Sequence, residues 1–349
     1  MFTITFSPLT DYRQIGQELY ESTETWKQEV GDFILKWVDS SDHILAQTSG
    51  STGTPKEMRL PKSAMRNSAL MTGNYFGFSE GQTALLCLST RYIAGKMMVI
   101  RAMIHHMNLV LVEPGANPLL EVDFPVDFAA MVPLQVRELL QSESGIASLE
   151  QLDKLLIGGG AMDGKLDAAL QPLNVQAFAS YGMTETVSHI ALRAVNGVKA
   201  STWFAPMDGV KLYSDERGCL SIDAPFLSDE RIVTNDLVEF SGDHRFRVIG
   251  RVDNIISSGG IKINPEKIEE QLSKVIDQPF VISSLPDERL ENRVVLIIEG
   301  DYGDKDGLME TLREVLTAHE VPKDIYTVQQ LIRTETGKIN RKETRSLLD

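Results

Sequence analysis

The sequence predicts an α/β protein, with a large domain that has a mainly parallel, helix-covered sheet and a small β subdomain, followed by an α+β domain. Between about residues 84 and 180, short apolar segments alternate with helical ones, which is typical of a parallel sheet covered by helices. From about 191 to 248 the pattern changes to short β-like segments separated by turn residues. After Gly250, strands and helices mix again. We therefore expect a core domain at residues 1–252 and a C-terminal domain at residues 253–349.

The elements follow in chain order. Before residue 46 we expect weak helices at 12–20 and 24–30 and a strand at 33–38. Pro61 is predicted to begin a helix that runs to about residue 76, with Met65, Ala69 and Leu70 on its inner face. The alternating region is predicted as strands at 84–88, 109–112, 128–132, 155–157 and 175–179 and helices at 95–107, 134–140 and 163–170. The C-terminal domain is predicted to hold helices at 265–276 and 307–319 around a strand at 294–299.

Composition limits the classes of function. The chain has 349 residues, 42% of them apolar and 24% charged, so it is globular and large enough for two domains. A formal net charge of −15 argues against nucleic acid or an anionic membrane as partner, because both require a broad basic surface. No segment predicts a signal peptide or a membrane span. We expect a cytoplasmic protein in which Cys87 and Cys219 are separate buried thiols.

Residues 47–56, Gln-Thr-Ser-Gly-Ser-Thr-Gly-Thr-Pro-Lys, have a composition that suits a phosphate. Glycines allow several backbone N–H groups to approach an anion, hydroxyls add donors, and a lysine adds charge. The stretch is not a Walker A loop, because Pro55 occupies the position of its second glycine. A solvated linker is the alternative. The predicted phosphate-binding residues are Thr48, Ser49, Gly50, Ser51, Thr52, Gly53 and Lys56.

Two segments that follow predicted strands suit a nucleotide. A glycine turn in this position lets the backbone approach a flat ring or a phosphate. In the second segment Tyr181 can stack on a base, Thr184 can donate to a phosphate and Glu185 can hold Mg²⁺. Each segment, taken alone, is also compatible with an ordinary polar loop. The predicted nucleotide-binding residues here are Gly158, Gly159, Gly160, Ala161, Ser180, Tyr181, Gly182 and Met183.

Two more positions complete the set. Asp236 can accept both hydroxyls of a ribose, and Arg251, fifteen residues later, can add donors to sugar or phosphate. Lys338 lies in Thr-Gly-Lys-Ile-Asn-Arg near the end of the sequence, where a solvated tail is the alternative. His105 and His106 are interpreted as helix-end residues, because no acidic or cysteine partner stands at metal-ligand spacing.

These five motifs, in this order over about residues 44–345, resemble those of the adenylate-forming enzymes, the superfamily of acyl-CoA synthetases and adenylation domains. The resemblance implies ATP and Mg²⁺ as cofactors, with Glu185 at the metal. It implies Thr184, Glu185 and Lys338 as catalytic residues, a mobile C-terminal domain with its hinge at Asp253, and coenzyme A as the acceptor. The family usually has glycine where this chain has Asn235. Because asparagine tolerates left-handed backbone, we expect Asp236 to keep its place.

Residues 152–191 are most similar to the o-succinylbenzoate:CoA ligase subfamily of menaquinone biosynthesis. This similarity implies an acid with a second carboxylate. The candidate acyl-substrate residues are Arg91, Tyr92, Gly95, Lys96, Ser188 and His189. Tyr92 stands where that subfamily usually has histidine, and His189 could equally be a satisfied core residue.

The resemblance implies a short form of the superfamily, and we expect it to lack most of the N-terminal subdomain that longer members place before the phosphate loop. A second subunit, in a homodimer, could close that side of the pocket. Three alternatives stay open: another acid:CoA ligase, an adenylation domain that loads a carrier protein, and a noncatalytic AMP-binding protein.

Overall fold

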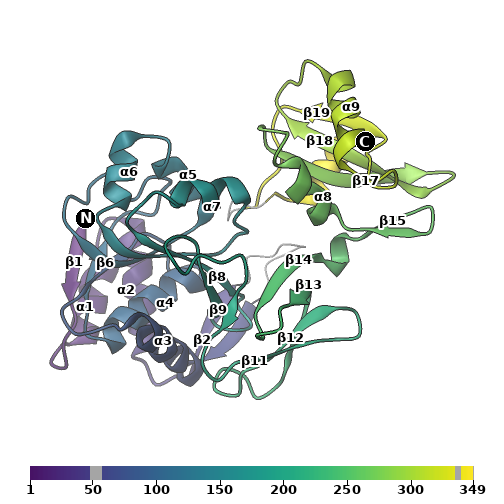
Figure 1. The fold of residues 1–349 in the computed structure, drawn as a ribbon. Coiled ribbons are helices and arrows are strands. Elements are labelled where there is room, and N and C mark those ends of the chain that lie inside the picture. The colour runs from purple at the N-terminus through teal and green to yellow at the C-terminus, as the bar shows by residue number, and fades with distance from the viewer. Residues whose placement is uncertain (48–56, 335–338, 349) are drawn as a thin grey trace.

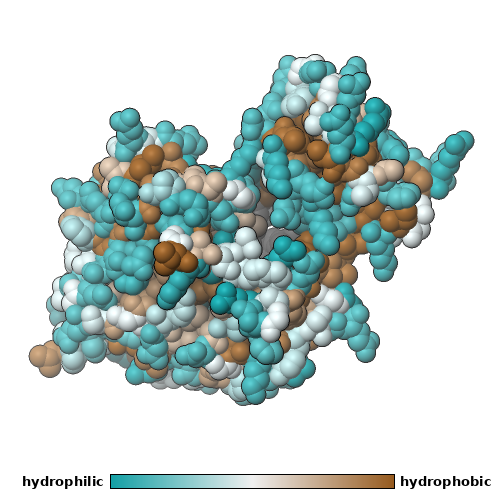
Figure 2. All heavy atoms as spheres, viewed as in Figure 1, coloured by the Kyte–Doolittle hydropathy of each residue, from teal (hydrophilic) through white to brown (hydrophobic). Residues whose placement is uncertain are grey.

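The structure is a computed structural model that describes residues 1–47, 57–334 and 339–348. Figure 1 shows a larger body formed by the N-terminal two thirds of the chain and a smaller body that follows β14 and holds the end of the chain. In the view of Figure 2, apolar side chains on the surface occur in small groups separated by hydrophilic ones. Among the described residues no helix is both long and apolar enough to cross a membrane.

The larger body is built on an eight-stranded sheet in the order β1-β5-β4-β6-β7-β8-β9-β10. Its five central strands are parallel, and β1, β9 and β10 are antiparallel additions at the two edges. The strands are β1 (Phe2–Thr5), β4 (Thr83–Leu86), β5 (Asn108–Leu111), β6 (Val126–Met131), β7 (Leu152–Ile157), β8 (Gln176–Gly182), β9 (His189–Ala194) and β10 (Ala205–Pro206). The α/β prediction is confirmed, although β9 and β10 belong to this sheet and not to the β subdomain.

Helices cover both faces of the sheet, since two separate hydrophobic clusters lie on either side of it. One cluster takes in α1 to α4 and the other α5 to α7. Burial on both faces explains why the central strands are almost continuously apolar. The helices are α1 (Tyr12–Tyr20), α2 (Thr25–Trp37), α3 (Lys62–Phe76), α4 (Ile93–Ile104), α5 (Pro133–Leu139), α6 (Glu143–Leu149) and α7 (Gly164–Leu170). Cys87 and Cys219 are buried and unpaired, as expected.

Several local predictions were wrong. The expected strand at 33–38 is the end of α2, where Val30, Phe33 and Ile34 are buried with helical spacing. Helix α3 begins at Lys62, with Pro61 as its N-cap in the strand that precedes it, and Leu70 is 36% exposed instead of facing the core. That strand, β3 (Glu57–Pro61), pairs antiparallel with β2 (His43–Gln47).

A four-stranded antiparallel sheet follows, as predicted for the small β subdomain. Its strands are β11 (Lys211–Ser214), β12 (Cys219–Asp223), β13 (Ile232–Phe240) and β14 (Phe246–Arg251). In the pairing of the last two strands, Asp236 lies opposite Arg251. The register therefore brings together two residues that are fifteen positions apart.

The C-terminal body has hydrophobic clusters of its own, drawn only from residues after 255. Its sheet is β17-β18-β19, next to the hairpin β15-β16. Both predicted helices are present, one ending earlier and one shifted by two to four residues. The elements are η1 (Val252–Asn254), β15 (Ile256–Ser258), β16 (Ile261–Ile263), α8 (Pro265–Leu272), β17 (Phe280–Asp287), β18 (Glu291–Glu299), α9 (Lys305–Val315), β19 (Asp324–Val328), α10 (Arg341–Arg345) and η2 (Ser346–Leu348).

Candidate active site

The two predicted nucleotide segments lie at one edge of the large sheet. They follow β7 and β8, which are parallel neighbours, so both begin at the carboxyl ends of their strands. At two positions in these segments there is no room for a side chain, so only glycine fits. A Cβ on Gly158 would lie 2.4 Å from the Ser180 Oγ, and a Cβ on Gly182 would lie 2.3 Å from the Ser188 carbonyl oxygen. Glycine at these positions therefore lets the chain segments pack closely.

The segment after β8 is a tight turn held by its own side chains. The Thr186 hydroxyl accepts from the Met183 N–H at 2.9 Å and donates to the Ser188 carbonyl at 2.7 Å. Val187 adopts a left-handed φ of 64°, an uncommon conformation for a β-branched residue. Thr184 is buried, whereas Glu185 is exposed. The turn thus fixes the backbone on either side of the Glu185 carboxylate.

Glu185 is the predicted metal-binding residue. The structure gives this carboxylate neither a hydrogen bond nor an ion pair to any described residue, and it finds no group of three potential protein ligands among them. Mg²⁺ commonly takes one or two carboxylates and completes its shell with water and substrate phosphates. A single exposed carboxylate beside the predicted nucleotide segments fits that pattern.

Asp236 and Arg251, the two residues expected at a ribose, lie together, and Tyr181, which was expected to stack on a base, contacts Asp236. The Tyr181 hydroxyl donates to Asp236 Oδ2 at 2.6 Å, and Arg251 Nη1 donates to Asp236 Oδ1 at 2.8 Å. Burial and the adjacent carboxylate raise the pKa of Tyr181, so its hydroxyl stays protonated. The ring of Tyr181 packs edge-on against Phe246. Each oxygen of the Asp236 carboxylate thus accepts a hydrogen bond, and the two bonds fix the orientation of the carboxylate.

The reason expected for Asn235 was wrong. Its backbone is not left-handed, because the described non-glycine residues with positive φ are His106, Val187, His244 and Glu291. Its side chain instead donates to both carboxylate oxygens of Asp253 and accepts from Arg217. The asparagine is therefore a hydrogen-bonding residue and not a substitute for glycine's conformational freedom.

Four of the six acyl-substrate candidates lie at the start of α4. Lys96 Nζ donates to the carbonyls of Thr90 and Arg91 at 2.5 and 2.9 Å. Burial lowers the pKa of Lys96 to about 8. A Cβ on Gly95 would lie 2.3 Å from the Ser89 carbonyl oxygen, so this glycine permits the close approach of loop and helix. Tyr92 is the N-cap of α4.

A hollow of about 300 Å³ lies beside these residues, between α2, β2 and the loop before α4. Arg91 and Lys96 line it together with acidic side chains from α2, including Glu29 and Asp32. Basic and acidic groups therefore share this hollow.

The other two candidates, Ser188 and His189, lie elsewhere, against a residue that sequence reasoning missed. Arg101, in the third turn of α4, donates from Nη2 to the Ser188 Oγ at 2.7 Å. The His189 ring lies between the hydroxyls of Ser188 and Thr72, at 3.4 and 3.3 Å. Burial, with a smaller contribution from Arg101, lowers the pKa of His189, so the imidazole is neutral.

Arg101 is 2% exposed, and no carboxylate of the described chain pairs with it. Its Nε is buried without a hydrogen-bond partner in the described residues. Burial lowers its pKa to about 9, so the guanidinium remains charged at pH 7. The signal in the sequence was a single arginine within the apolar run Met97–Met103. This corner of the core therefore holds a buried positive charge that the described residues leave uncompensated.

The remaining predicted residues, Thr48, Ser49, Gly50, Ser51, Thr52, Gly53, Lys56 and Lys338, lie outside the described residues.

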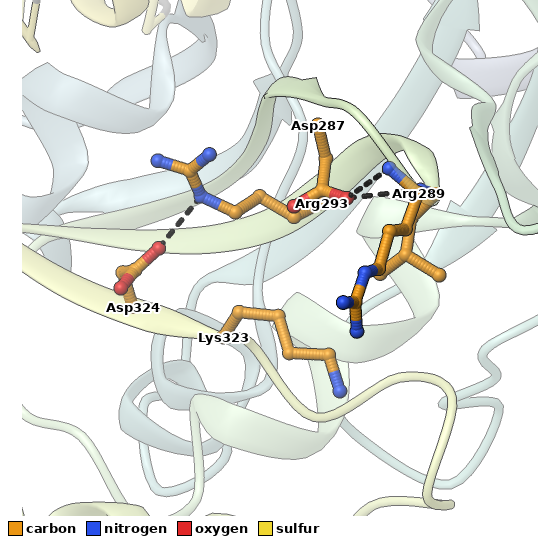
Figure 3. A pocket seen from close by; sticks show the side chains of 6 residues that line it. Asp287, Arg289, Arg293, Lys323 and Asp324 are labelled. Atoms are coloured by element: carbon orange, nitrogen blue, oxygen red, sulfur yellow. Dashed lines mark hydrogen bonds and ion pairs between the residues drawn. The ribbon is translucent and has the colours of Figure 1, made fainter.

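The C-terminal body has a separate hollow of about 510 Å³, with basic side chains around it (Figure 3). Arg293 donates to Asp324 at 2.8 Å, and the Asp287 carboxylate accepts from the backbone of Arg289 and Leu290. Arg289 and Lys323 form no ion pair with the described chain, so their charges are available here. Three basic and two acidic side chains line this hollow, in a chain of net charge −15, and we call it the basic hollow.

Comparison with known proteins gives concordant matches. Residues 10–220 match the family model described as AMP-binding enzyme. A probable 2-succinylbenzoate–CoA ligase of Mycobacterium tuberculosis (strain CDC 1551 / Oshkosh) is 27% identical, over 87% of this chain and 84% of the relative. The 2-succinylbenzoate–CoA ligase of Escherichia coli (strain K12) is 24% identical, over 89% of this chain and 70% of the relative.

Two solved structures have a similar fold. The acyl-CoA synthetase (AMP-forming)/AMP-acid ligase II-like protein of Dyadobacter fermentans DSM 18053 is 34% identical, with a TM-score of 0.66, and the match covers 100% of this chain and 99% of that chain. The o-succinylbenzoate coenzyme A synthetase of Bacillus subtilis, in complex with ATP and magnesium ion, is 19% identical with a TM-score of 0.73, and the match covers 97% and 82% of the two chains.

Proposed function

Because this chain belongs to the AMP-binding enzyme family, we propose that it is an AMP-forming ligase that joins 2-succinylbenzoate to coenzyme A, with ATP converted to AMP and diphosphate. The proposal places the enzyme in menaquinone biosynthesis and in the cytoplasm, where ATP and coenzyme A are available.

The observation that carries the substrate assignment is Arg101. A buried cation without an acidic partner is costly, and an anionic ligand group relieves that cost. An acid with a second carboxylate supplies this group, whereas a monoacid leaves the guanidinium uncompensated. Ser188, held by His189, orients the guanidinium. The names of the relatives agree with this substrate class.

In the first half-reaction, the acid's carboxylate attacks the α-phosphorus of ATP. This attack of one anion on another requires neutralisation and in-line placement. We assign the phosphates to the loop at residues 48–56 and the ribose to Asp236 with Arg251. Mg²⁺, held by Glu185, would supply charge neutralisation at the phosphates. Lys338 would place its ammonium at the α-phosphate, and Thr184 would donate to a phosphate oxygen.

In the second half-reaction, the thiol of coenzyme A displaces AMP from the mixed anhydride. We propose that the C-terminal domain, residues 253–349, turns about Asp253 between the two steps. The basic hollow at Arg289 and Lys323 supports an acceptor that carries phosphates. A homodimer that closes the hollow near α2 is part of this proposal, and light scattering after size-exclusion chromatography tests it.

The test is a panel of carboxylic acids assayed for ATP-dependent diphosphate release, with and without coenzyme A. We expect 2-succinylbenzoate to react best and to yield a thioester detectable by mass spectrometry. A simple monoacid that reacts at least about ten times faster than 2-succinylbenzoate would refute the proposed substrate. Diphosphate exchange without thioester would identify a carrier-loading domain instead. No release with any acid would leave a noncatalytic AMP-binding protein.

The role of Lys338 can be isolated by measuring the half-reactions separately. Lys338→Ala should slow adenylate formation by about 10²- to 10³-fold, the usual loss for one preorganised electrostatic donor. Given preformed acyl-adenylate and coenzyme A, the variant should form thioester at close to the wild-type rate. Equal losses in both halves would contradict the two-step assignment.

A further inference from the structure

The carboxylate of Asp253 is held by two groups of the larger body. Asn235 Nδ2 donates to both of its oxygens at 3.1 Å, and Arg251 Nη2 donates to Oδ2 at 2.9 Å. Asn235 belongs to β13 and Arg251 ends β14, whereas Asp253 lies in η1, where the chain leaves for the C-terminal body. These hydrogen bonds therefore join the two bodies where the chain passes from one to the other.

The orientation of the Asn235 carboxamide is fixed by Arg217. Arg217 Nη1 donates to Asn235 Oδ1 at 2.9 Å, and because a guanidinium has no acceptor, the amide must present its oxygen to the arginine and its NH₂ to Asp253. Arg217 also donates to the Thr234 carbonyl at 2.9 Å and pairs with Asp215. The bond from Asp215 raises the pKa of Arg217. A chain of hydrogen bonds thus runs from the β11–β12 turn to Asp253.

We propose that Asn235 is a positioning residue that holds Asp253 against the larger body and releases it when the C-terminal domain turns. The inference rests on the proposed function, which assigns that turn to Asp253. Glycine, the usual residue of the family at this position, has no side chain to make this contact. The hold by Asn235 stabilises the arrangement seen in the structure relative to any arrangement in which Asp253 has moved away. It therefore sets the balance between the two half-reactions.

Arg251 connects the contact between Asn235 and Asp253 to the proposed ribose site. Arg251 donates to Asp253 from one terminal nitrogen and to Asp236 from the other. A substitution at Arg251 would therefore disturb both the ribose site and Asp253. The Asn235 side chain is hydrogen-bonded to Asp253 and Arg217 and not to Asp236, so its substitution leaves the hydrogen bonds of the ribose site in place.

Two substitutions of Asn235 are expected to weaken its contact with Asp253 to different extents. Asn235→Gly removes the donor, and Asn235→Asp keeps the size but places a carboxylate against that of Asp253. Arg217→Gln tests the orienting arginine. Asn292→Asp is the matched control, because the Asn292 amide donates to the Ser257 carbonyl at 3.1 Å within the C-terminal body. The same chemical change is thus made where no contact between the bodies is lost.

The first measurement is a distance distribution by double electron–electron resonance. Spin labels are attached to Gln141→Cys and Glu310→Cys, two exposed positions on different bodies, in the full-length protein. The native thiols of Cys87 and Cys219 are buried, so labelling is selective. We expect one dominant distance for wild type and for Asn292→Asp, and a second, increased population for both Asn235 variants, larger for Asn235→Asp, and for Arg217→Gln.

The second measurement is the ratio of the two half-reaction rates. Loss of the Asn235 amide as a donor to a partly exposed carboxylate should change this ratio by about three- to tenfold in Asn235→Gly, with no change in Asn292→Asp. Unaltered distances and an unaltered ratio in both Asn235 variants would overturn the inference, as would equal losses in both half-reactions without a distance change. The distance measurement requires no turnover. A wild-type protein that is inactive with every acid would therefore refute the proposed function. The role of Asn235 in holding Asp253 would then be tested by the distance measurement alone.

Discussion

Arg101 in the larger body is buried and Arg341 in the smaller one is largely buried, at 2% and 22% exposure, but the surroundings of the two arginines differ. Arg341 contacts both oxygens of Glu269 at 2.5 Å, reaches Glu266 at 3.4 Å and donates to the Ile282 carbonyl. Burial acts to lower its pKa, but the carboxylates outweigh burial and raise it. Arg101 has Ser188 and no acid of the described chain, and burial lowers its pKa to about 9.

This difference distinguishes Arg341, whose charge has a structural role, from Arg101, whose charge we propose binds a ligand. The acids of α8 neutralise Arg341, so its ion pairs fix α10 against α8. The described protein does not neutralise Arg101, and under the proposed function a carboxylate of the substrate compensates its charge. Three substitutions that remove or alter a cation test this interpretation at decreasing size of effect.

The largest effect is expected from Arg341→Met, because it leaves Glu266 and Glu269 side by side without a cation. The C-terminal body should lose about 3 kcal/mol of its free energy of unfolding. All three tryptophans, Trp26, Trp37 and Trp203, lie before residue 252, so native-state hydrogen exchange of β17 and β18 amides is the appropriate measurement.

Two further substitutions serve as comparisons for Arg341→Met. Arg289→Met, an arginine of the same body without an ion pair to the described chain, should stay within about 0.5 kcal/mol of wild type. Arg101→Met should not destabilise the larger body, since it removes an uncompensated charge from the core. A loss at position 101 as large as that at 341 would contradict the distinction between the two arginines.

An intermediate effect is expected from Lys96, whose amine is buried against two carbonyls. Its pKa is lowered from 10.5 to about 8, so between these pH values the unfolded chain binds the proton that the folded chain has lost. Stability from this group is therefore reduced below pH 8 and recovered as the pH rises toward 10.5. Between pH 7 and pH 10 this recovery is about 2.5 kcal/mol.

Urea denaturation of wild type and Lys96→Met at pH 7 and at pH 10 measures this contribution. The difference in unfolding free energy between the two proteins should shift in favour of wild type at the higher pH. A difference that does not change with pH would mean that the amine is not penalised by burial.

The smallest effect per residue is expected for the exposed cations of the basic hollow. Arg289→Ala combined with Lys323→Ala should raise the KM for coenzyme A by about tenfold, the equivalent of a few exposed charge contacts, and leave adenylate formation unchanged. Arg313→Ala, on an exposed position of α9, is the control. An unchanged KM in the double variant would remove the hollow from the acceptor site.

The extent to which the site could be predicted follows from the type of residue. Gly158 directly follows β7 and Gly182 ends β8, and their motifs predicted a nucleotide site at this edge once the resemblance to the family was added. Asp236 and Arg251 were chosen by their side-chain chemistry and the family resemblance, and the pairing of β13 with β14 places them opposite one another. Arg101 was missed because a sequence does not show whether a charge in an apolar helix has a partner elsewhere in the fold.

Other errors have equally specific causes. Residues 33–38 contain several apolar and aromatic side chains and resemble a strand over six positions, but they complete the helical face that Val30 begins. Asn235 was explained by backbone tolerance, because its partners Arg217 and Asp253 are eighteen residues away on either side. Contacts of that range depend on tertiary structure and not on local preference.

The most direct test of the proposed substrate is a specificity ratio at Arg101. The kcat/KM for 2-succinylbenzoate is compared with that for an analogue whose non-reacting carboxylate is a methyl ester, in wild type and in Arg101→Met. Removing one partner of a buried charge pair costs several kcal/mol, so wild type should prefer the diacid by about 10²-fold or more. In Arg101→Met that preference should fall to about one, while Lys96→Met retains it. A preference that survives in Arg101→Met would contradict the assignment of this buried arginine to the second carboxylate.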